Sequence, residues 1–216
     1  MKSKYRKIIG LTLIVLGVGT VGIRVGGKIL FERESKKEVY AFLETNIADS
    51  SVSKSETLKS DIKNTDKDEI KKENDNSKEV YENINSEDKI GVIEIPNLGV
   101  QHLIVEGTGK EEIKKNVGHF EDTAMPGEYG NFAVAGHRNN LYNEVFKGLA
   151  DVEIGTQIII KALHGEFRYQ IYSKEVIEPE NISVLDQDFS KKEMTMITCT
   201  KDGKKRVCVK AKLIEL

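Results

Sequence analysis

The chain has 216 residues and a net charge of −2, with 33 basic and 35 acidic residues. This length allows one compact domain with appendages. The mixed charge, without a dense basic stripe or interleaved aromatic residues, argues against a nucleic-acid partner, and two cysteines are too few for a disulfide scaffold.

The N-terminus carries the pattern of a membrane anchor. An uncharged run from Ile8 to Ile23 follows the basic residues Lys2, Lys4, Arg6 and Lys7. The run is shorter than the roughly 20 residues of a typical span, but the flanking Arg24 and Lys28 can snorkel toward the interface. No Ala-x-Ala-like site follows, which disfavours a cleavable signal peptide. We therefore expect residues 1–31 to form a cytoplasmic tip and an uncleaved transmembrane signal anchor, with the rest of the chain outside the cell.

Residues 32–89 are rich in charged, Ser and Asn residues and poor in aromatics. Such a composition buries too little apolar surface to offset the entropy cost of ordering the chain. We expect a charged linker that holds a domain away from the membrane, with Lys36–Leu43 continuing the helix outward. A helical stalk is the alternative, because Lys and Glu favour helices.

Residues 90–216 show strand-like runs at short spacing, separated by turn signals. A tight turn is expected at His164-Gly165, and a helix over residues 141–149, where apolar residues recur at helical spacing after a cap at Asn139 or Asn140. Many short strands predict a mainly β domain built as a closed or partly closed barrel with short helices. The seven predicted strands are Gly91–Pro96, Val100–Val105, Asn131–Ala135, Gln157–Ala162, Phe167–Tyr172, Met194–Thr198 and Arg206–Ala211.

The last two of these runs flank Asp202-Gly203, a strong signal for a hairpin with a type I′ turn. In that register Cys199 faces Arg206, with Cβ atoms about 4.5–5.5 Å apart. Cys208 faces Ile197 and lies diagonally from Cys199, beyond comfortable disulfide reach. We expect two independent thiols, with Cys208 in the core. A guanidinium beside the Cys199 thiol favours the thiolate and can receive a developing oxyanion.

Four histidines are candidate partners for this thiol. His164 is expected to be a solvated turn residue, His102 has no polar companions in its strand, and His119 lies in a loop with no strand to hold it. His137 follows a buried strand, where Gly136 lets the chain turn, and such junctions commonly carry catalytic side chains. From the residues alone, structural roles for His137 and Cys199 are the commoner outcome.

Three motifs in order resemble the sortases, which are membrane-anchored cysteine transpeptidases of Gram-positive bacteria. They are the run GEYGNFAVAGHR that begins at Gly127, the run MITCT that begins at Met196, and Arg206 on the following strand. The resemblance implies that Cys199 is the nucleophile of a TLxTC-type motif in which Met196 replaces Leu. It also implies that His137 and Arg206 are catalytic, and that the fold is a small β-barrel. Sortases cleave an LPXTG-like signal between Thr and Gly, and pass the acyl chain through a thioester to an amine of a cell-wall precursor or a pilin lysine.

The short hairpin and the absence of a long insertion look most like class D, with class E possible. The acidic residues Glu111, Glu112, Glu121 and Asp122 are interpreted as solvated surface, so no metal and no cofactor are expected. No carboxylate or Asn is clearly placed to orient His137, so a full triad is not expected. Thr198 is expected to contact the peptide backbone. The Leu-Pro part of the signal is expected to dock on apolar residues that are equally compatible with core positions: Ala135, Val184, Leu185 and Ile197.

Three alternatives accompany this interpretation. A hydrolytic cysteine protease of the cell envelope differs only in whether water or an amine resolves the thioester. A tethered β-barrel binding module would keep Cys199 as an inert core residue. An L,D-transpeptidase is disfavoured, because its Ser-x-Gly-Cys pattern does not precede Cys199.

Overall fold

The computed structural model describes residues 23, 25–45, 80–81, 84–85, 88–138 and 144–214. The chain divides into two units, Met1–Glu34 and Ser35–Leu216. The described part of the first unit is helical over residues 25–34. No helix within the described ranges is long and apolar enough to cross a membrane. Most of the anchor predicted for residues 1–31, and most of the predicted linker, lie outside these ranges.

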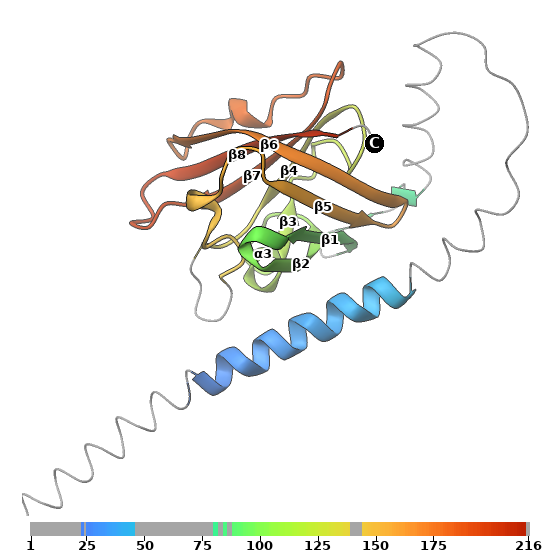
Figure 1. The fold of residues 1–216 in the computed structure, drawn as a ribbon, viewed down its shortest axis with the longest axis vertical. Helices are drawn as coiled ribbons and strands as arrows, with labels where there is room; N and C mark the ends of the chain where they lie inside the picture. Colours follow the sequence, from blue (N-terminus) through green and yellow to red (C-terminus); the bar gives the residue numbers. More distant parts are fainter. Residues whose placement is uncertain are drawn as a thin grey trace, which may run out of the picture. The chain divides into compact units, whose positions relative to one another are not determined.

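The second unit contains a closed β-barrel (Figure 1). Its helical elements are short: η1 (Pro96–Leu98), α3 (Glu112–Lys115), η2 (Leu149–Asp151) and η3 (Ile182–Leu185). The prediction of a mainly β barrel with short helices is confirmed. Its strands are β1 (Lys89–Ile95), β2 (Val100–Glu106), β3 (Val117–His119), β4 (Gly130–Ala135), β5 (Gln157–Ala162), β6 (Gly165–Ile177), β7 (Lys192–Cys199) and β8 (Arg206–Leu213).

Around the barrel the strands follow the order β1-β2-β3-β4-β7-β8-β6-β5, and β5 pairs with β1 to close it. The β2–β3 and β4–β7 pairs are parallel, and the other pairs are antiparallel. All seven predicted strands are present. The eighth, β3, escaped prediction because the three residues Val-Gly-His are too few to show an alternating pattern. The position of β7 between β4 and β8 brings two distant chain segments to either side of Cys199.

Alternation along the strands decides which residues fill the barrel. Phe132 and Val134 of β4 and Met194 and Met196 of β7 belong to the main core. Burying an apolar side chain of this size stabilises the fold by about 1.5–3 kcal/mol. Because side chains alternate between the two faces of a strand, the residues between these positions face the outside of the barrel. That outer face carries Ala135, Ile197 and Cys199.

The described part of residues 141–149 does not form the predicted helix. Residues 139–143 lie outside the described ranges, and residues 144–148 form turns that lead into η2. The backbone bonds are of the i→i+3 type, from Lys147 N–H to Glu144 O and from Leu149 N–H to Phe146 O. The apolar spacing still identified a buried surface, because Val145, Phe146 and Leu149 are all buried.

The β5–β6 hairpin turns one residue earlier than expected. Ala162 pairs with Gly165, so Leu163 and His164 form the turn. His164 is half-buried, with Nδ1 3.1 Å from the Tyr81 hydroxyl and Nε2 3.0 Å from the Pro126 carbonyl oxygen. Its burial lowers the pKa of the imidazole. The expectation of a solvated turn histidine is therefore wrong, because Tyr81, far away in sequence, covers the ring.

Part of the predicted linker packs against the barrel. Residues 35–45 are helical, and Val39 and Phe42 are buried in a cluster with Val92 of β1 and Leu103 of β2. Ser35 Oγ lies 3.4 Å from Nδ1 of His102, so that histidine does have a polar companion, and burial lowers its pKa to about 4. The linker composition did not reveal this contact because it depends on two apolar residues in a charged segment.

Candidate active site

His137, Cys199 and Arg206 come from three adjacent segments of the barrel wall. In the β7–β8 ladder Cys199 pairs directly with Arg206, and Ile197 pairs with Cys208, as the sequence predicts. In the parallel β4–β7 ladder the last pair is Ala135 with Ile197. Two residues further along each chain come His137, in the loop after β4, and Cys199, at the end of β7. We call His137, Cys199 and Arg206 the Cys–His–Arg row.

Gly136 continues the ladder beyond the end of β4 and fixes the start of the histidine loop. Its N–H donates to the carbonyl oxygen of Ile197 at 3.1 Å, and its own carbonyl oxygen accepts from the Thr198 hydroxyl at 2.8 Å. Phe146 closes the loop from the other side, because its N–H donates to the His137 carbonyl at 3.1 Å. A Cβ at position 136 would lie only 2.7 Å from the Phe146 ring, so a larger residue would force this buried ring or the loop to shift.

Thr198 is almost fully buried, at 2% exposure, and its hydroxyl is used inside the protein. Thr198 therefore has a structural role, because it attaches the histidine loop to β7. Its contact with the peptide backbone stays a prediction, and its side chain points to the face opposite Cys199, since successive residues of a strand point to opposite faces.

The loop between β7 and β8 differs from the predicted type I′ turn. Gly203 N–H donates to the Thr200 carbonyl at 2.9 Å, so the central residues of the turn are Lys201 and Asp202. Gly203 then adopts the left-handed conformation with φ 74°. Thr200 N–H donates to the Lys205 carbonyl at 3.0 Å, which leaves four residues in the loop instead of two. Both loops are centred between Asp202 and Gly203, so the predicted register survives the change of turn type.

This loop also holds Arg206. The guanidinium Nη1 donates to the carbonyl oxygens of Gly203 and Lys205 at 3.3 and 3.1 Å. The turn itself is braced by the Thr200 hydroxyl, which donates to Asp202 Oδ1 at 2.6 Å. The arginine head group is therefore held by backbone carbonyls of the loop, which limits its conformational freedom.

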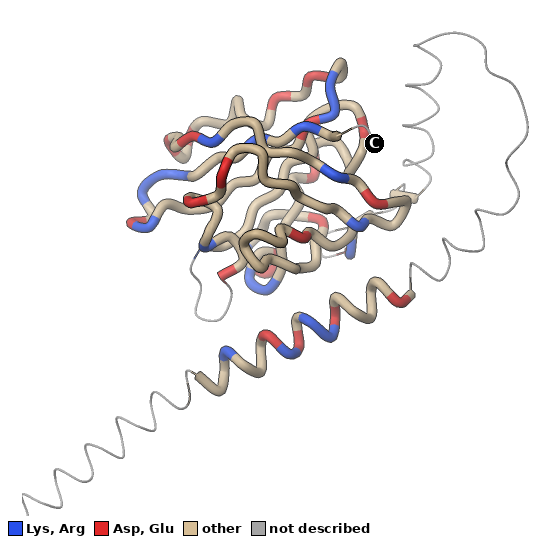
Figure 2. The backbone as a smooth tube through the Cα atoms, viewed as in Figure 1, with Lys and Arg blue, Asp and Glu red and all other residues tan. Residues whose placement is uncertain are grey.

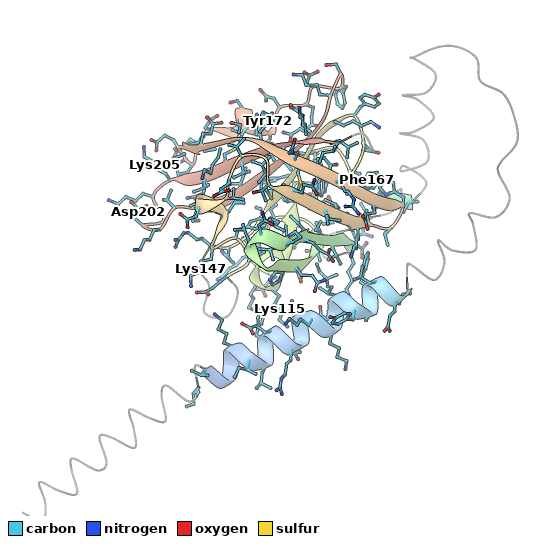
Figure 3. All side chains as sticks on the ribbon, in the orientation of Figure 1. Lys115, Lys147, Phe167, Tyr172, Asp202 and Lys205 are labelled. Atoms are coloured by element: carbon cyan, nitrogen blue, oxygen red, sulfur yellow. The ribbon has the colours of Figure 1, made fainter. Side chains whose placement is uncertain are left out.

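Positive charge is concentrated at the same end of the barrel. Lys201, Lys204, Lys205 and Arg206 lie within six consecutive residues, and Figure 2 shows them as the blue part of this hairpin. Asp202 and Lys205 project from the loop (Figure 3), and Lys205 pairs with Glu178 at 2.6 Å. These charges follow directly on the end of β7, which carries Cys199.

The two cysteines have different environments. Cys199 is partly exposed, whereas Cys208 is buried, and both are free thiols. Burial raises the pKa of the Cys208 thiol to about 11, so this residue stays protonated at neutral pH. The prediction that Cys208 is a core residue is confirmed.

The imidazole of His137 is half-buried, and this burial lowers its pKa. The neutral ring is thus favoured at neutral pH. No residue in the described part forms a hydrogen bond with the His137 ring. Residues 139–143, which follow closely in sequence, lie outside the described part.

The apolar residues suggested for substrate contact meet on the outer face of the barrel. Ala135 pairs with Ile197 at the end of the β4–β7 ladder. Val184 of η3 is buried with Ile177 and Cys208, and Leu185 and Ile197 pack against this cluster. Val184 therefore forms the floor of this surface, while Leu185, Ile197 and Ala135 are partly exposed on it.

His119 is not a loop residue, contrary to expectation. It ends β3 and is fully buried, with Nδ1 2.8 Å from Glu106 Oε2 and Nε2 2.9 Å from the Thr123 hydroxyl oxygen. Both ring nitrogens are thus occupied within the core. In the described part of the chain, no group of three or more His, Cys, Asp or Glu side chains has an arrangement suited to a metal ion.

The site combines a partly exposed cysteine thiol, a histidine and an arginine on the wall of a closed β-barrel. This combination is typical of β-barrel proteins that act through a cysteine. A sequence model described as the sortase domain matches residues 93–214. The chain belongs to the sortase family.

Known sortases are similar to different shares of this chain. Sortase D of Bacillus subtilis (strain 168) is 32% identical over 109 residues, which cover 50% of this chain and 53% of that protein. The structure of a Clostridium perfringens sortase D5 transpeptidase is 42% identical, with a TM-score of 0.60, and covers 68% of this chain and 95% of that one. Sortase C from C. perfringens with the C-terminal cell wall sorting motif shares the fold, with a TM-score of 0.66 at 21% identity over 84% of this chain and 100% of that one. The chain spans about half the length of the B. subtilis relative.

Proposed function

We propose that this protein is a class D-like sortase that cleaves an LPXTG-like sorting signal between Thr and Gly and transfers the acyl part to an amine. The observation that carries the proposal is the pairing of Cys199 with Arg206, together with the pairing of Ala135 and Ile197 that ends two residues before His137 and Cys199. Membership of the sortase family and the 42% identity to a sortase D5 transpeptidase support the same activity.

In the first half-reaction the Cys199 thiolate attacks the carbonyl carbon of the signal threonine. The negative charge that forms on the carbonyl oxygen is stabilised by the Arg206 guanidinium and nearby backbone N–H groups. The C–N bond then breaks, His137 as imidazolium gives its proton to the departing glycine amine, and a thioester on Cys199 remains.

In the second half-reaction an amine attacks the thioester carbonyl. The neutral imidazole of His137 accepts a proton from this amine, the C–S bond breaks, and the thiolate of Cys199 is restored. The enzyme therefore returns to its starting protonation state, and no external acid or base is consumed.

This cycle needs Cys199 as thiolate and His137 as imidazolium at the same time. Burial lowers the pKa of His137, so the imidazolium is the minor form at neutral pH. We expect the reactive ion-pair form to be a minority species, which limits the turnover of the enzyme rather than its specificity.

The sorting signal is proposed to dock on the outer face of β4 and β7. Ala135, Leu185 and Ile197 are partly exposed there, beside Cys199, and suit an apolar Leu-Pro segment. The acceptor is proposed to be an amine of a peptidoglycan precursor or of a pilin lysine.

Product analysis tests the reaction. A purified protein incubated with an LPXTG-type peptide and glycinamide is expected to yield a new product in which the amine is joined to the Thr carbonyl. Without glycinamide, the thioester is expected to hydrolyse slowly. An unchanged carboxylic acid product in both mixtures would identify a hydrolytic protease instead, and the absence of any cleavage would favour a binding module.

We further propose that residues 1–31 anchor the protein in the cell membrane by a single span, with the catalytic domain outside the cell. The support is the basic cluster before the uncharged run of residues 8–23. Protease added to intact cells is expected to remove the barrel while a cytoplasmic marker protein stays intact. Full protection of the barrel would contradict this topology.

A further inference from the structure

A cluster of side-chain amides lies outside the Cys–His–Arg row. The centre of the cluster is Gln187, which follows η3. Its Oε1 accepts from the N–H groups of Asn131 and Ala124 at 2.9 and 3.3 Å. Its Nε2 donates to the carbonyl oxygens of Asn131 and Leu185 at 3.1 and 2.8 Å. A carboxamide has two acceptor sites and two donor hydrogens, so this side chain is fully satisfied.

Asn131 of β4 makes the reciprocal connection. Its Nδ2 donates to the carbonyl oxygens of Val184 and Asp186 at 2.9 and 3.4 Å. Its Oδ1 accepts from the Thr195 hydroxyl of β7 at 2.8 Å. Asn131 and Thr195 are 3% and 1% exposed. Buried hydrogen bonds of side-chain amides are costly to break, because the loss of one partner leaves the other as a desolvated polar group.

Gly130 makes room for this cluster. A Cβ at this position would lie 2.7 Å from Gln187 Oε1 and 2.9 Å from the Ala124 Cβ atom, and the backbone has φ 126°. Glycine at position 130 thus permits both the backbone conformation and the close approach of the Gln187 amide. The local chain geometry at the start of β4 is adapted to receive the side chain of a residue 57 positions later.

The segment held by these amides carries apolar residues of the surface proposed for docking. Residues 184–187 are bonded to β4 through Gln187 and Asn131. Leu185 packs against the same apolar cluster as Ile197, which lies two residues before Cys199. The same segment lines one wall of an open cleft of about 490 Å³, through Ile182, Leu185 and Asp186. The loop of residues 120–123 lines the same cleft. Gln187 joins the two segments, because its side chain accepts from the N–H of Ala124, the residue after this loop, and donates to the Leu185 carbonyl oxygen.

We propose that Gln187 is a positioning residue that fixes the η3 segment against β4 and β7, and so sets the surface on which the sorting signal docks. The inference rests on the proposed function. Gln187 acts through Leu185 and Val184, not on the reacting atoms. Its loss therefore weakens binding of the peptide and leaves the chemistry of the Cys199 thiol unchanged.

The test compares Gln187→Met with the wild-type full chain. Since a few hydrogen bonds hold the segment, we expect KM for an LPXTG-type peptide to rise about tenfold or more, while kcat changes less than about threefold. Alkylation of Cys199 by iodoacetamide should keep its rate. Gln170→Met is the matched control, because the Gln170 side chain lies outside this cluster and donates to the Gly155 carbonyl oxygen at 3.3 Å, so KM should not change.

A second measurement reports on the segment itself. Thermolysin, which cuts before apolar residues, should cleave near Val184 or Leu185 faster in Gln187→Met than in the wild type, as followed by mass spectrometry. Gln187→Glu has the same length and keeps the acceptor oxygens but loses the Nε2 donor, and it should shift KM and cleavage in the same direction if Gln187→Met does not fold.

The possible outcomes separate the two proposals. A wild-type protein that cleaves the peptide, together with a Gln187 variant of unchanged KM and unchanged thermolysin cleavage, overturns the positioning role alone. A fall in kcat at constant KM also overturns it, because that would place Gln187 in the chemistry. A wild-type protein without activity refutes the proposed function, and the thermolysin result then decides whether Gln187 holds the segment.

Discussion

Cys199→Ala is expected to abolish both thioester formation and cleavage of an LPXTG-type peptide, with a loss of at least about 10⁴-fold in kcat/KM. The thiol is the only group of the Cys–His–Arg row that forms a covalent bond to the substrate in the proposed cycle. Its side chain is partly exposed at the end of β7, so its truncation should change the melting temperature by only a few degrees. Mass spectrometry of the trapped acyl-enzyme measures the first effect, and thermal unfolding measures the second.

Cys208→Ala is the matched control, because it removes the other thiol of the same hairpin. This variant loses core packing below η3 but keeps the nucleophile, so it should lose stability while it still forms the thioester. Iodoacetamide should label the wild type once, at Cys199, since Cys208 is buried and its pKa is raised to about 11. Thioester formation by Cys199→Ala would reject Cys199 as the nucleophile.

Arg206→Lys is expected to lower kcat by about 10²–10³-fold, the typical cost of removing one donor from an oxyanion site. Lysine keeps the charge but lacks the planar guanidinium, and it cannot reproduce the bonds from Nη1 to the Gly203 and Lys205 carbonyls. The side chain is only partly buried, so the free energy of unfolding should fall by less than about 1 kcal/mol. Steady-state kinetics and denaturant unfolding measure the two quantities.

Arg168→Lys provides the same chemical change on β6, where Arg168 pairs with Glu166 at the surface. Its kcat and its stability should both stay close to those of the wild type. If Arg206→Lys lost stability and activity in equal proportion, Arg206 would be a structural residue of the hairpin and not a stabiliser of the oxyanion.

The register of the β7–β8 hairpin was predictable although its turn was not. Hairpin pairing depends on the centre of the loop, and a two-residue and a four-residue loop can share that centre. The turn type depends on interactions that a dipeptide signal does not encode, above all the Thr200 hydroxyl bonded to Asp202 and to the Lys205 N–H. Cys199 and Arg206 were therefore correctly paired, while the loop that holds the arginine was not foreseen.

The surroundings of two histidines, in contrast, were not predictable from the sequence. His119 and His164 were judged by their neighbours in sequence, which are turn formers, but the structure surrounds both with residues from other segments. Glu106 of β2 lies against His119, and Tyr81 covers His164. A side chain's burial depends on what packs on it from distant parts of the chain, and local composition carries little information about that.

The sequence by itself determined seven of the eight strands in the described part, the mainly β barrel class, the pairing of Cys199 with Arg206 and the separation of Cys208 as core, because all of these follow from period-two alternation and a centred turn. Only the tertiary structure decided that β7 lies between β4 and β8, that Thr198 attaches the start of the histidine loop to β7, and that Gln187 joins η3 to β4. The physical reason is the range of the interactions. Alternation and turns act between near neighbours, whereas the parallel β4–β7 pairing and the buried side-chain amides join residues about sixty positions apart. Such distant residues meet only once the barrel has closed.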